Sequence, residues 1–288
     1  MATTNRVFIV IAFVFSLKAA IFNIVALSTE KWITANAGDV SNPTDRNYVN
    51  YGLFLGNYKM TFPSGAVYEL VITCNFKNNI CAMLCGLDYE ARAKVLDDLY
   101  NNKKDNSTDN YCPGITKSTY AFMVFQNQPR YLRADSITIT KDQFINAGVW
   151  LSSLIFLILA MLAGSWSAIL ALCNTVFNPI SYLFSVKSLF IYNAVAFFST
   201  VLYMALWGIN YNLHIFHNVA IYDTLVGNLS SDKNAFLGYS YWIGFIPLAF
   251  YAGSVGILYY REHLNERDPR NKVVSLEAYS ADPNLYLY

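Results

Sequence analysis

The sequence predicts a membrane protein that is mainly α: a four-transmembrane-helix bundle with a small extracellular antiparallel β-sheet. Three observations lead to this fold class. Of the 288 residues, 55% are hydrophobic and only 14% are charged, which is more apolar surface than one soluble core can bury. Four apolar runs are long enough to cross about 30 Å of hydrocarbon as helices. A long polar stretch between the first two runs holds four of the five cysteines.

The four predicted transmembrane helices are residues 7–28, 147–173, 189–210 and 238–260. The first could be a signal peptide, but it exceeds the usual apolar core of such peptides and no A-x-A site follows it, so we expect it to stay. Lys18 lies near its centre, where a bare ammonium is costly. We expect Lys18 to face the bundle interior or to snorkel, and a gating or contact charge is the alternative.

The first outer loop, residues 29–146, is the region on which we expect function to depend. Its charge is balanced, with twelve Lys and Arg against twelve Asp and Glu. β-rich segments bounded by Gly, Pro and Asn predict an antiparallel sheet; they are residues 49–55, 67–73, 118–126 and 136–140. Residues 88–100 place Val95 and Leu99, and Leu96 and Tyr100, four apart, which predicts a helix packed on that sheet.

The remaining connections are short. Residues 1–6 precede the first helix, residues 174–188 join the second to the third, and residues 211–237 form the second outer loop. In that loop apolar residues keep helical spacing, so we expect the third helix to continue and to end before Gly227. Residues 261–288 are polar and predict a disordered tail.

Small residues mark two helix faces that could pack closely. Ala160, Gly164 and Ala168 follow one another at four-residue spacing in the second helix, and Gly253 and Gly256 lie in the fourth. In lipid, small side chains let helix backbones approach each other. Packing within the chain is the main interpretation, and a homo-oligomer seam stays open.

Short basic flanks predict the topology. Arg6, Lys187 and the basic residues after the fourth helix fall on one side, against Lys233 on the other, so both termini should be cytoplasmic. The acceptor sequons at Asn106 and Asn228 then both lie outside, as glycosylation requires. We expect a multi-pass glycoprotein of the plasma membrane or the secretory pathway.

The cysteines agree with this topology. Cys74, Cys81, Cys85 and Cys112 lie in the first outer loop, and an even number in an oxidising compartment predicts two disulfides with three possible connectivities. Cys173 lies at the cytoplasmic end of the second helix, where it is either a palmitoylation site or a buried, inert thiol.

Residues able to carry chemistry are few. His214 and His217 could share a helix face, but no Cys or Glu stands at ligand spacing, so no metal and no cofactor are expected. No hydrolase, nucleotide or zinc-protease motif occurs, which argues against an enzyme. The net charge of +1 favours lipid and protein partners over nucleic acid.

Tyr286, Leu287 and Tyr288 form an apolar-x-apolar terminus that could add to a PDZ domain.

Several short motifs occur in a fixed order along the chain. They are Trp32 after the first helix, Tyr51-Gly52-Leu53-Phe54, Cys85-Gly86-Leu87, Asn178-Pro179, Tyr241-Trp242 and the terminal Leu287-Tyr288. The tryptophan, G-L-aromatic and cysteine pattern resembles the claudin-like tetraspan superfamily, and within it the clarin family. The resemblance covers most of the chain, although each motif is short.

The resemblance implies a left-handed four-helix bundle capped by an outer sheet. It also implies a disulfide between Cys74 and Cys85, which would leave Cys81 to pair with Cys112. Clarin-like proteins are non-enzymatic membrane organisers that support sensory-cell protrusions or synapses through protein trafficking and actin-linked scaffolding. The alternatives are a claudin-like junction or adhesion protein and an auxiliary subunit of an ion channel.

Overall fold

The long helices dominate the structure, which is a computed structural model. It describes residues 2–39, 42–61, 65–86, 88–102, 139–176, 186–227 and 229–267. In this part of the chain four helices are long and apolar enough to cross a membrane. They are α1 (Ala2–Ser28), α4 (Ala147–Val176), α5 (Val186–Asn210) and α8 (Phe245–Arg267), the last preceded by α7 (Tyr239–Ile243). The predicted four-helix pattern is therefore confirmed, with helices that run beyond the apolar stretches.

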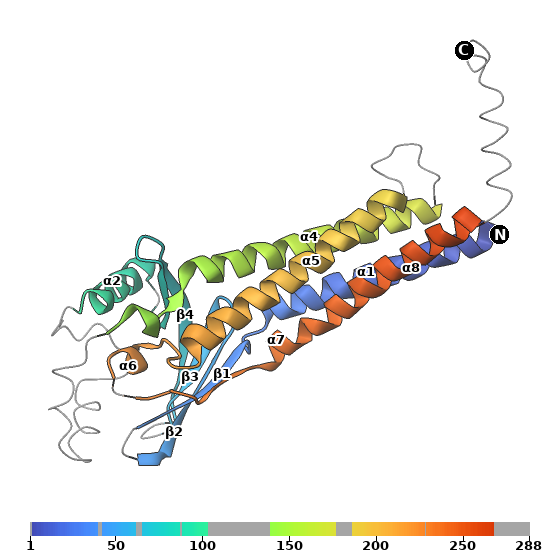
Figure 1. The fold of residues 1–288 in the computed structure, drawn as a ribbon. Coiled ribbons are helices and arrows are strands. Elements are labelled where there is room, and N and C mark those ends of the chain that lie inside the picture. Colours follow the sequence, from blue (N-terminus) through green and yellow to red (C-terminus); the bar gives the residue numbers. More distant parts are fainter. Residues whose placement is uncertain are drawn as a thin grey trace, which may run out of the picture. The chain divides into compact units, whose positions relative to one another are not determined.

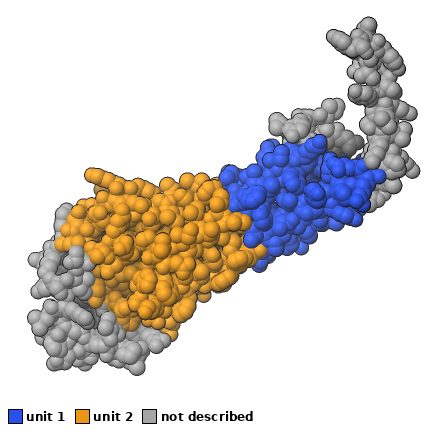
Figure 2. Space-filling view, in the orientation of Figure 1, with its two compact units in different colours: residues 1–22, 159–199, 246–288 blue, residues 23–158, 200–245 orange. Residues whose placement is uncertain are grey.

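The chain divides into two compact units (Figure 2). Unit 1 comprises residues 1–22, 159–199 and 246–288, and unit 2 comprises residues 23–158 and 200–245. Each of the four long helices contributes residues to both units. Unit 2 also contains the sheet.

The sheet of unit 2 has seven described strands, all antiparallel, in the order β6-β5-β4-β3-β2-β1-β7. The strands are β1 (Ile33–Asp39), β2 (Asn42–Tyr51), β3 (Leu55–Lys59), β4 (Val67–Asn75), β5 (Ile80–Leu84), β6 (Ile145–Asn146) and β7 (Ala235–Leu237). The expectation that the first loop alone builds the sheet is wrong. β7 lies within residues 211–237, which we expected to form the second outer loop, and it pairs with the free edge of β1, which would otherwise leave backbone groups unpaired.

The strand predictions had mixed outcomes. The segment 67–73 lies within β4, as predicted. The segment 49–55 is not one strand, because the chain turns after Tyr51 and the Gly52 amide donates to the Leu55 carbonyl at 2.7 Å. The predicted strand at 118–126 and most of the one at 136–140 lie outside the described residues.

The predicted helix over 88–100 is confirmed as α2 (Tyr89–Tyr100), which lies on β4 and β5 (Figure 1). Asp88 caps it by accepting a hydrogen bond from the Glu90 amide. Leu96 and Leu99 pack into one apolar cluster with Ile80 and Leu84 of β5. The apolar face of the helix therefore covers one end of the sheet.

The two faces of the sheet have different surroundings. On one face Ile33, Val49, Tyr58 and Leu70 are buried in the main core of unit 2. α2 covers part of the other face. Where α2 does not cover that face, large apolar side chains are exposed, among them Tyr48, Val67 and Phe236. Because successive residues of a strand point to opposite faces, this division follows from the strand register.

The chain beyond α5 is less helical than its spacing predicts. A π-helical turn, Tyr211–Ile215, ends the helix, and a short helix α6 (Tyr222–Leu225) follows. The buried Asn218 explains the break, because its side-chain oxygen accepts from the Ala220 amide at 2.8 Å and from the Thr224 hydroxyl at 2.7 Å. These local bonds give the backbone an alternative to the helix.

Unit 1 is held by polar and small residues. Ser16 Oγ donates to Asn193 Oδ1 at 2.8 Å, and the Asn193 amide donates to Ser167 Oγ at 2.6 Å. Ser254 Oγ lies 3.4 Å from Ser16 Oγ, so α1, α4, α5 and α8 each supply one member of this buried cluster. Hydrogen bonds between helices stabilise association where lipid offers no other partner.

Candidate interaction site at the foot of the sheet

Trp32 is almost fully buried where the sheet of unit 2 meets the helices. Its indole N–H donates to the Ala26 carbonyl at 2.7 Å, and its backbone amide donates to the Tyr51 carbonyl at 3.0 Å. Its ring contacts Trp207 edge-on, with the centroids 5.5 Å apart. Tyr203 and Tyr241 add two further edge contacts. A single side chain therefore joins the end of α1, the start of β1 and α5.

Gly52 permits a close approach of two backbones. A Cβ at this position would lie 2.5 Å from the Thr29 carbonyl oxygen and 3.0 Å from Glu30 Cα. Since the neighbouring atoms belong to the backbone, no side chain can be accommodated without moving the turn. The Tyr51–Phe54 turn consequently sits directly against the end of α1.

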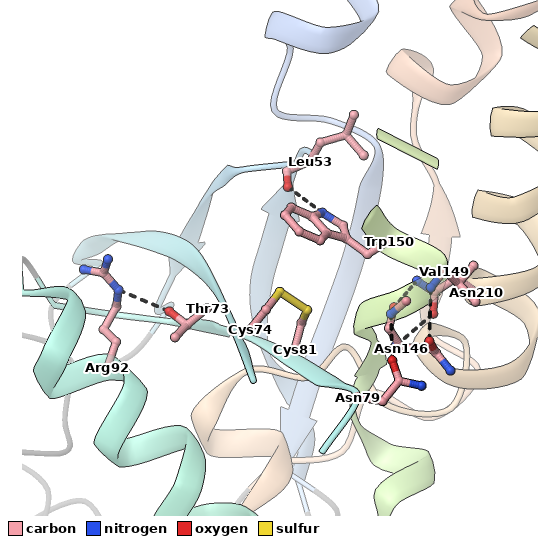
Figure 3. Close-up of a disulfide and its surroundings, with 11 residues drawn as sticks. Leu53, Thr73, Cys74, Asn79, Cys81, Arg92, Asn146, Val149, Trp150 and Asn210 are labelled. Carbon is pink, nitrogen blue, oxygen red and sulfur yellow. Dashed lines mark hydrogen bonds between the residues drawn. A yellow bond between two sulfur atoms is a disulfide. The ribbon is translucent and has the colours of Figure 1, made fainter. Parts of the chain in front are cut away.

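Leu53 and Phe54 fasten the same turn to α4. The Trp150 indole N–H donates to the Leu53 carbonyl at 3.0 Å (Figure 3). The Phe54 ring meets the Trp150 ring edge-on, with the centroids 6.3 Å apart. Leu53 is buried, whereas Phe54 is exposed. We call the buried residues Trp32, Tyr51, Leu53, Trp150 and Trp207 the tryptophan clamp.

The disulfide in this region differs from the pairing that the resemblance implied. Cys74 of β4 bonds to Cys81 of β5, with the Cα atoms 4.1 Å apart (Figure 3). The expected Cys74–Cys85 pair is wrong, because the β4–β5 hairpin sets Cys74 directly opposite Cys81 in the register. Because Cys81 is already bonded to Cys74, the implied Cys81–Cys112 pair is excluded as well. Cys85 is also disulfide-bonded. Cys112 itself lies outside the described residues.

A junction of asparagines next to the disulfide was not predicted. Asn146 caps α4 by accepting from the Val149 amide at 3.1 Å, and Asn210 Oδ1 accepts from the Asn146 amide at 3.1 Å. Asn79, in the β4–β5 turn, accepts from the Gly148 amide at 2.7 Å (Figure 3). The hairpin, α4 and α5 therefore meet through side-chain amides. An Asn immediately before a helix is the signal that could have indicated the cap.

Arg92 holds α2 to the sheet. The side chain is buried, and its Nε donates to Thr73 Oγ1 at 3.2 Å (Figure 3). One terminal nitrogen also donates to the Gly86 carbonyl. A guanidinium placed between two polar acceptors fixes the helix in one orientation.

The second outer loop contacts the buried face of the sheet near Tyr58. Burial raises the pKa of the Tyr58 hydroxyl well above its usual value, and the charge of the Asp223 carboxyl in α6 raises this pKa further. Burial likewise raises the pKa of Tyr51. Both phenols are therefore neutral at physiological pH. Ala220 and Ile221 belong to the same core, so the loop is part of the folded body of unit 2.

The small residues predicted for helix packing lie in unit 1. Ala160, Gly164 and Ala168 are buried, and a Cβ on Gly164 would lie 2.0 Å from the Tyr251 hydroxyl oxygen. A Cβ on Gly253 would lie 2.9 Å from the Phe15 ring, whereas one on Gly256 would meet nothing within 4 Å. All of these positions except Gly256 are therefore covered by other residues of the same chain.

The other candidate residues within the described part of the chain do not form a common site. His214 Nδ1 lies 3.1 Å from the Asp142 carbonyl oxygen, and His217 Nδ1 lies 3.0 Å from Asp232 Oδ1, so the imidazoles have separate partners. Cys173 is a partly buried free thiol. The sequons at Asn106 and Asn228, and the terminal Tyr286, Leu287 and Tyr288, lie outside the described residues.

No known protein family matches this chain, and no curated protein is significantly similar to it. The site must therefore be interpreted from its geometry. Its residues form a structural joint: they fix the turn between β2 and β3, the end of α1 and the start of α4 to one another. Such a joint holds a protein surface in a defined orientation.

Proposed function

We propose that the chain is a non-enzymatic membrane organiser with four transmembrane helices, whose outer sheet shares a core with the helix ends of unit 2. The observation that supports this is the continuous core of unit 2. It includes Ile33 and Val49 of the sheet, Val219 and Ala220 of the second outer loop, and helix residues such as Leu157. A core shared by the sheet and the helix ends of unit 2 suits the positioning of other membrane proteins.

The membrane placement is part of the proposal. Both termini would be cytoplasmic, and the sheet would lie outside the cell or in the lumen, as the distribution of basic residues favours. Asn106 and Asn228 would carry glycans, and the Cys74–Cys81 disulfide fits an oxidising compartment. The host membrane would be the plasma membrane or one of the secretory pathway.

The partners follow from the resemblance to clarins. We propose that residues 286–288 bind a PDZ-containing, actin-linked scaffold, and that the protein supports membrane protrusions or synapses of sensory cells. The packing of Trp32 and of the Tyr51–Phe54 turn supports the part of the proposal that concerns the outer domain. The scaffold and the tissue come from the resemblance alone.

Proximity labelling in a sensory cell tests this function. A labelling enzyme fused to the tail would be compared between the intact chain and a chain that lacks residues 286–288, with surface delivery measured for both. We expect PDZ and actin-linked proteins to be labelled by the intact chain and lost after the deletion.

A labelled set that is unchanged by the deletion and dominated by junction proteins would contradict the organiser function and favour the adhesion alternative. Dominance of a pore-forming subunit would favour the auxiliary-subunit alternative. Mobility of the Asn106→Gln and Asn228→Gln variants on gels, before and after enzymatic deglycosylation, tests the topology separately. A wild-type chain without glycan at either position would count against an outer sheet.

A further inference from the structure

Lys18 is not in the interior of the bundle. It is an exposed residue of α1 in unit 1, and the interaction seen for it there is with an aromatic ring, its ammonium lying 5.8 Å from the centroid of Phe250 in α8. The first alternative for this residue, a position facing the bundle interior, is therefore wrong. Buried polar positions of unit 1 are filled instead by Ser16, Ser167, Asn193 and Ser254.

The position of Lys18 along α1 is central. It stands twelve residues after Arg6 and ten before Ser28, the limits of the apolar stretch. At a rise of 1.5 Å per residue these separations are about 18 Å and 15 Å, so the backbone of Lys18 lies near the middle of a hydrocarbon core about 30 Å thick. Its four methylenes cannot span half of that thickness to bring the ammonium to water.

The described residues supply no counter-charge to this ammonium. No carboxylate lies within ion-pair distance of Lys18 among the described residues. The membrane-crossing helices α1, α4 and α5 contain no Asp or Glu, and in α8 both acidic residues, Glu262 and Glu266, lie at the far end. A charge in the membrane that has no partner among the described residues of its own chain indicates a partner from another molecule.

We infer that Lys18 marks a docking seam between α1 and α8 for a membrane-spanning helix of another protein, one that carries an aspartate or glutamate near its middle. The inference rests on the proposed membrane placement and names a class of partner for the organiser. Charge complementarity selects this occupant, because a carboxylate is the group that neutralises an ammonium at this depth.

Two other occupants fit less well. A second copy of this chain would bring a second ammonium and no carboxylate to a symmetric contact. Anionic lipid headgroups lie at the hydrocarbon boundary, about 15 Å from the bilayer centre. The surface beside Lys18 is suited to a helix: Leu17 and Ile21 of α1 are exposed, and Phe250 packs against Phe15 with the ring centroids 5.4 Å apart.

The test uses the full chain reconstituted in neutral phosphatidylcholine vesicles with a synthetic probe. The probe is a leucine-rich transmembrane peptide with one central aspartate, and the control peptide has leucine at that position. Energy transfer between a donor on the protein and an acceptor on the peptide measures association. We expect the aspartate peptide to associate about tenfold more strongly than the leucine peptide.

Variants assign the effect to Lys18. Lys18→Leu should abolish the preference for aspartate, Lys18→Arg should retain it, and Lys18→Asp should prefer a peptide with a central lysine. Equal binding of both peptides to the wild-type chain, or an unchanged preference in Lys18→Leu, would overturn the inference. Strong transfer between labelled copies of the chain without peptide, lost in Lys18→Leu, would also overturn it and assign the seam to a homodimer.

The result is separable from the test of the proposed function. Loss of the tail-dependent scaffold would contradict the organiser function but would leave peptide binding in vesicles intact. Failure of the peptide to bind would leave the scaffold result unchanged. Carbonate extraction of the vesicles checks that every variant is inserted, and a wild-type chain that is extracted would contradict the membrane placement on which both depend.

Discussion

Units 1 and 2 are stabilised by different kinds of side chain. Unit 1 joins its helices through small and hydroxyl or amide residues, such as Gly164 against Tyr251 and Ser16 against Asn193. Unit 2 buries large aromatic residues, with Trp32 and Trp207 both almost inaccessible, and adds backbone ladders and a disulfide. The difference matches the expected surroundings, because burial of apolar area stabilises a fold in water but not among lipid tails.

The contrast identifies which substitutions should be costly in each unit. In unit 2 the lost quantity is buried apolar area, so truncating a large side chain should have the greatest effect. In unit 1 the lost quantity is close approach or an interhelical hydrogen bond, so adding one methyl group or removing one amide should matter. The following predictions run from the largest expected effect to the smallest.

Trp32→Ala should be the most destabilising change. It removes a buried ring that contacts Tyr203, Trp207 and Tyr241, and it removes the shorter of the two described side-chain hydrogen bonds to the Ala26 carbonyl. We expect a loss of about 3–5 kcal/mol in the free energy of unfolding, measured by thermal denaturation in detergent. Trp166→Ala is the control, because Trp166 lies on the surface of unit 1 with 43% of its area exposed. Similar losses in both variants would remove the proposed contrast.

Removing the disulfide should have the next largest effect. Cys74→Ala combined with Cys81→Ala opens a loop with a sequence separation of seven, and we expect a loss of about 2.5 kcal/mol from the chain-entropy relation. Cys173→Ala, which changes a free thiol, is the control and should have little effect. Mass spectrometry of the unreduced wild-type chain checks the pairing. A Cys74–Cys85 link would contradict it and restore the pairing implied by the resemblance.

Gly164→Ala should destabilise unit 1 although it adds only a methyl group. The new Cβ would lie 2.0 Å from the hydroxyl oxygen of Tyr251, a fully buried side chain that donates to the Ala160 carbonyl and so cannot withdraw freely. Overpacking of this kind costs about 1–3 kcal/mol. Gly256→Ala is the matched control, since its methyl group would enter open space. An equal melting temperature for the two variants would show that α4 and α8 do not pack as described.

Asn193→Ala should have the smallest effect of the four. It removes the amide that joins Ser16 to Ser167, and interhelical hydrogen bonds in membranes contribute about 1 kcal/mol. Thr175→Ala is a suitable comparison, because the hydrogen bond of the Thr175 hydroxyl within the described part of the chain goes back to the Ala171 carbonyl of its own helix. If both substitutions lower the melting temperature equally, the polar cluster does not join the helices.

The sequence predicts the features that depend on local pattern. The apolar runs predict α1, α4, α5 and α8, and residues four apart predict α2, because each of these elements is specified by its own periodicity. The turn within 49–55 was missed, although Gly52 offered a signal. A glycine inside a strand pattern often marks a close backbone approach, and here it lies against the Thr29 carbonyl.

The features that depend on distant pairing were not predictable in the same way. β7 has three residues and gains its partner from β1, about two hundred positions earlier in the chain, so no local pattern reveals it. The disulfide is an intermediate case. Residues 75–79 are rich in asparagine and form a tight turn, so a hairpin interpretation would have set Cys74 opposite Cys81. Following the resemblance instead led to the wrong pair.

The exposed position of Lys18 excludes the first of its two expected placements, the bundle interior, and the reason is physical. The interior of unit 1 is already occupied by a hydrogen-bonded set of neutral residues in which Ser16, two positions earlier on α1, is fully buried. Two residues apart on a helix point in nearly opposite directions, so burying Ser16 directs Lys18 outward. A pattern of polar residues at 16, 167, 193 and 254 could have indicated this only once the helices were aligned.

Hydrogen–deuterium exchange tests most directly whether the tryptophan clamp joins the sheet to the helix ends of unit 2. The full chain in lipid nanodiscs would be compared with its Trp32→Ala variant, with Trp166→Ala as the control. If the clamp holds the sheet in place, the amides of β1, β2 and β3 should exchange faster in Trp32→Ala. The amides of the part of α4 in unit 1, residues 159–176, should stay protected. Unchanged protection of these strands, or an equal increase in both units, would contradict the account.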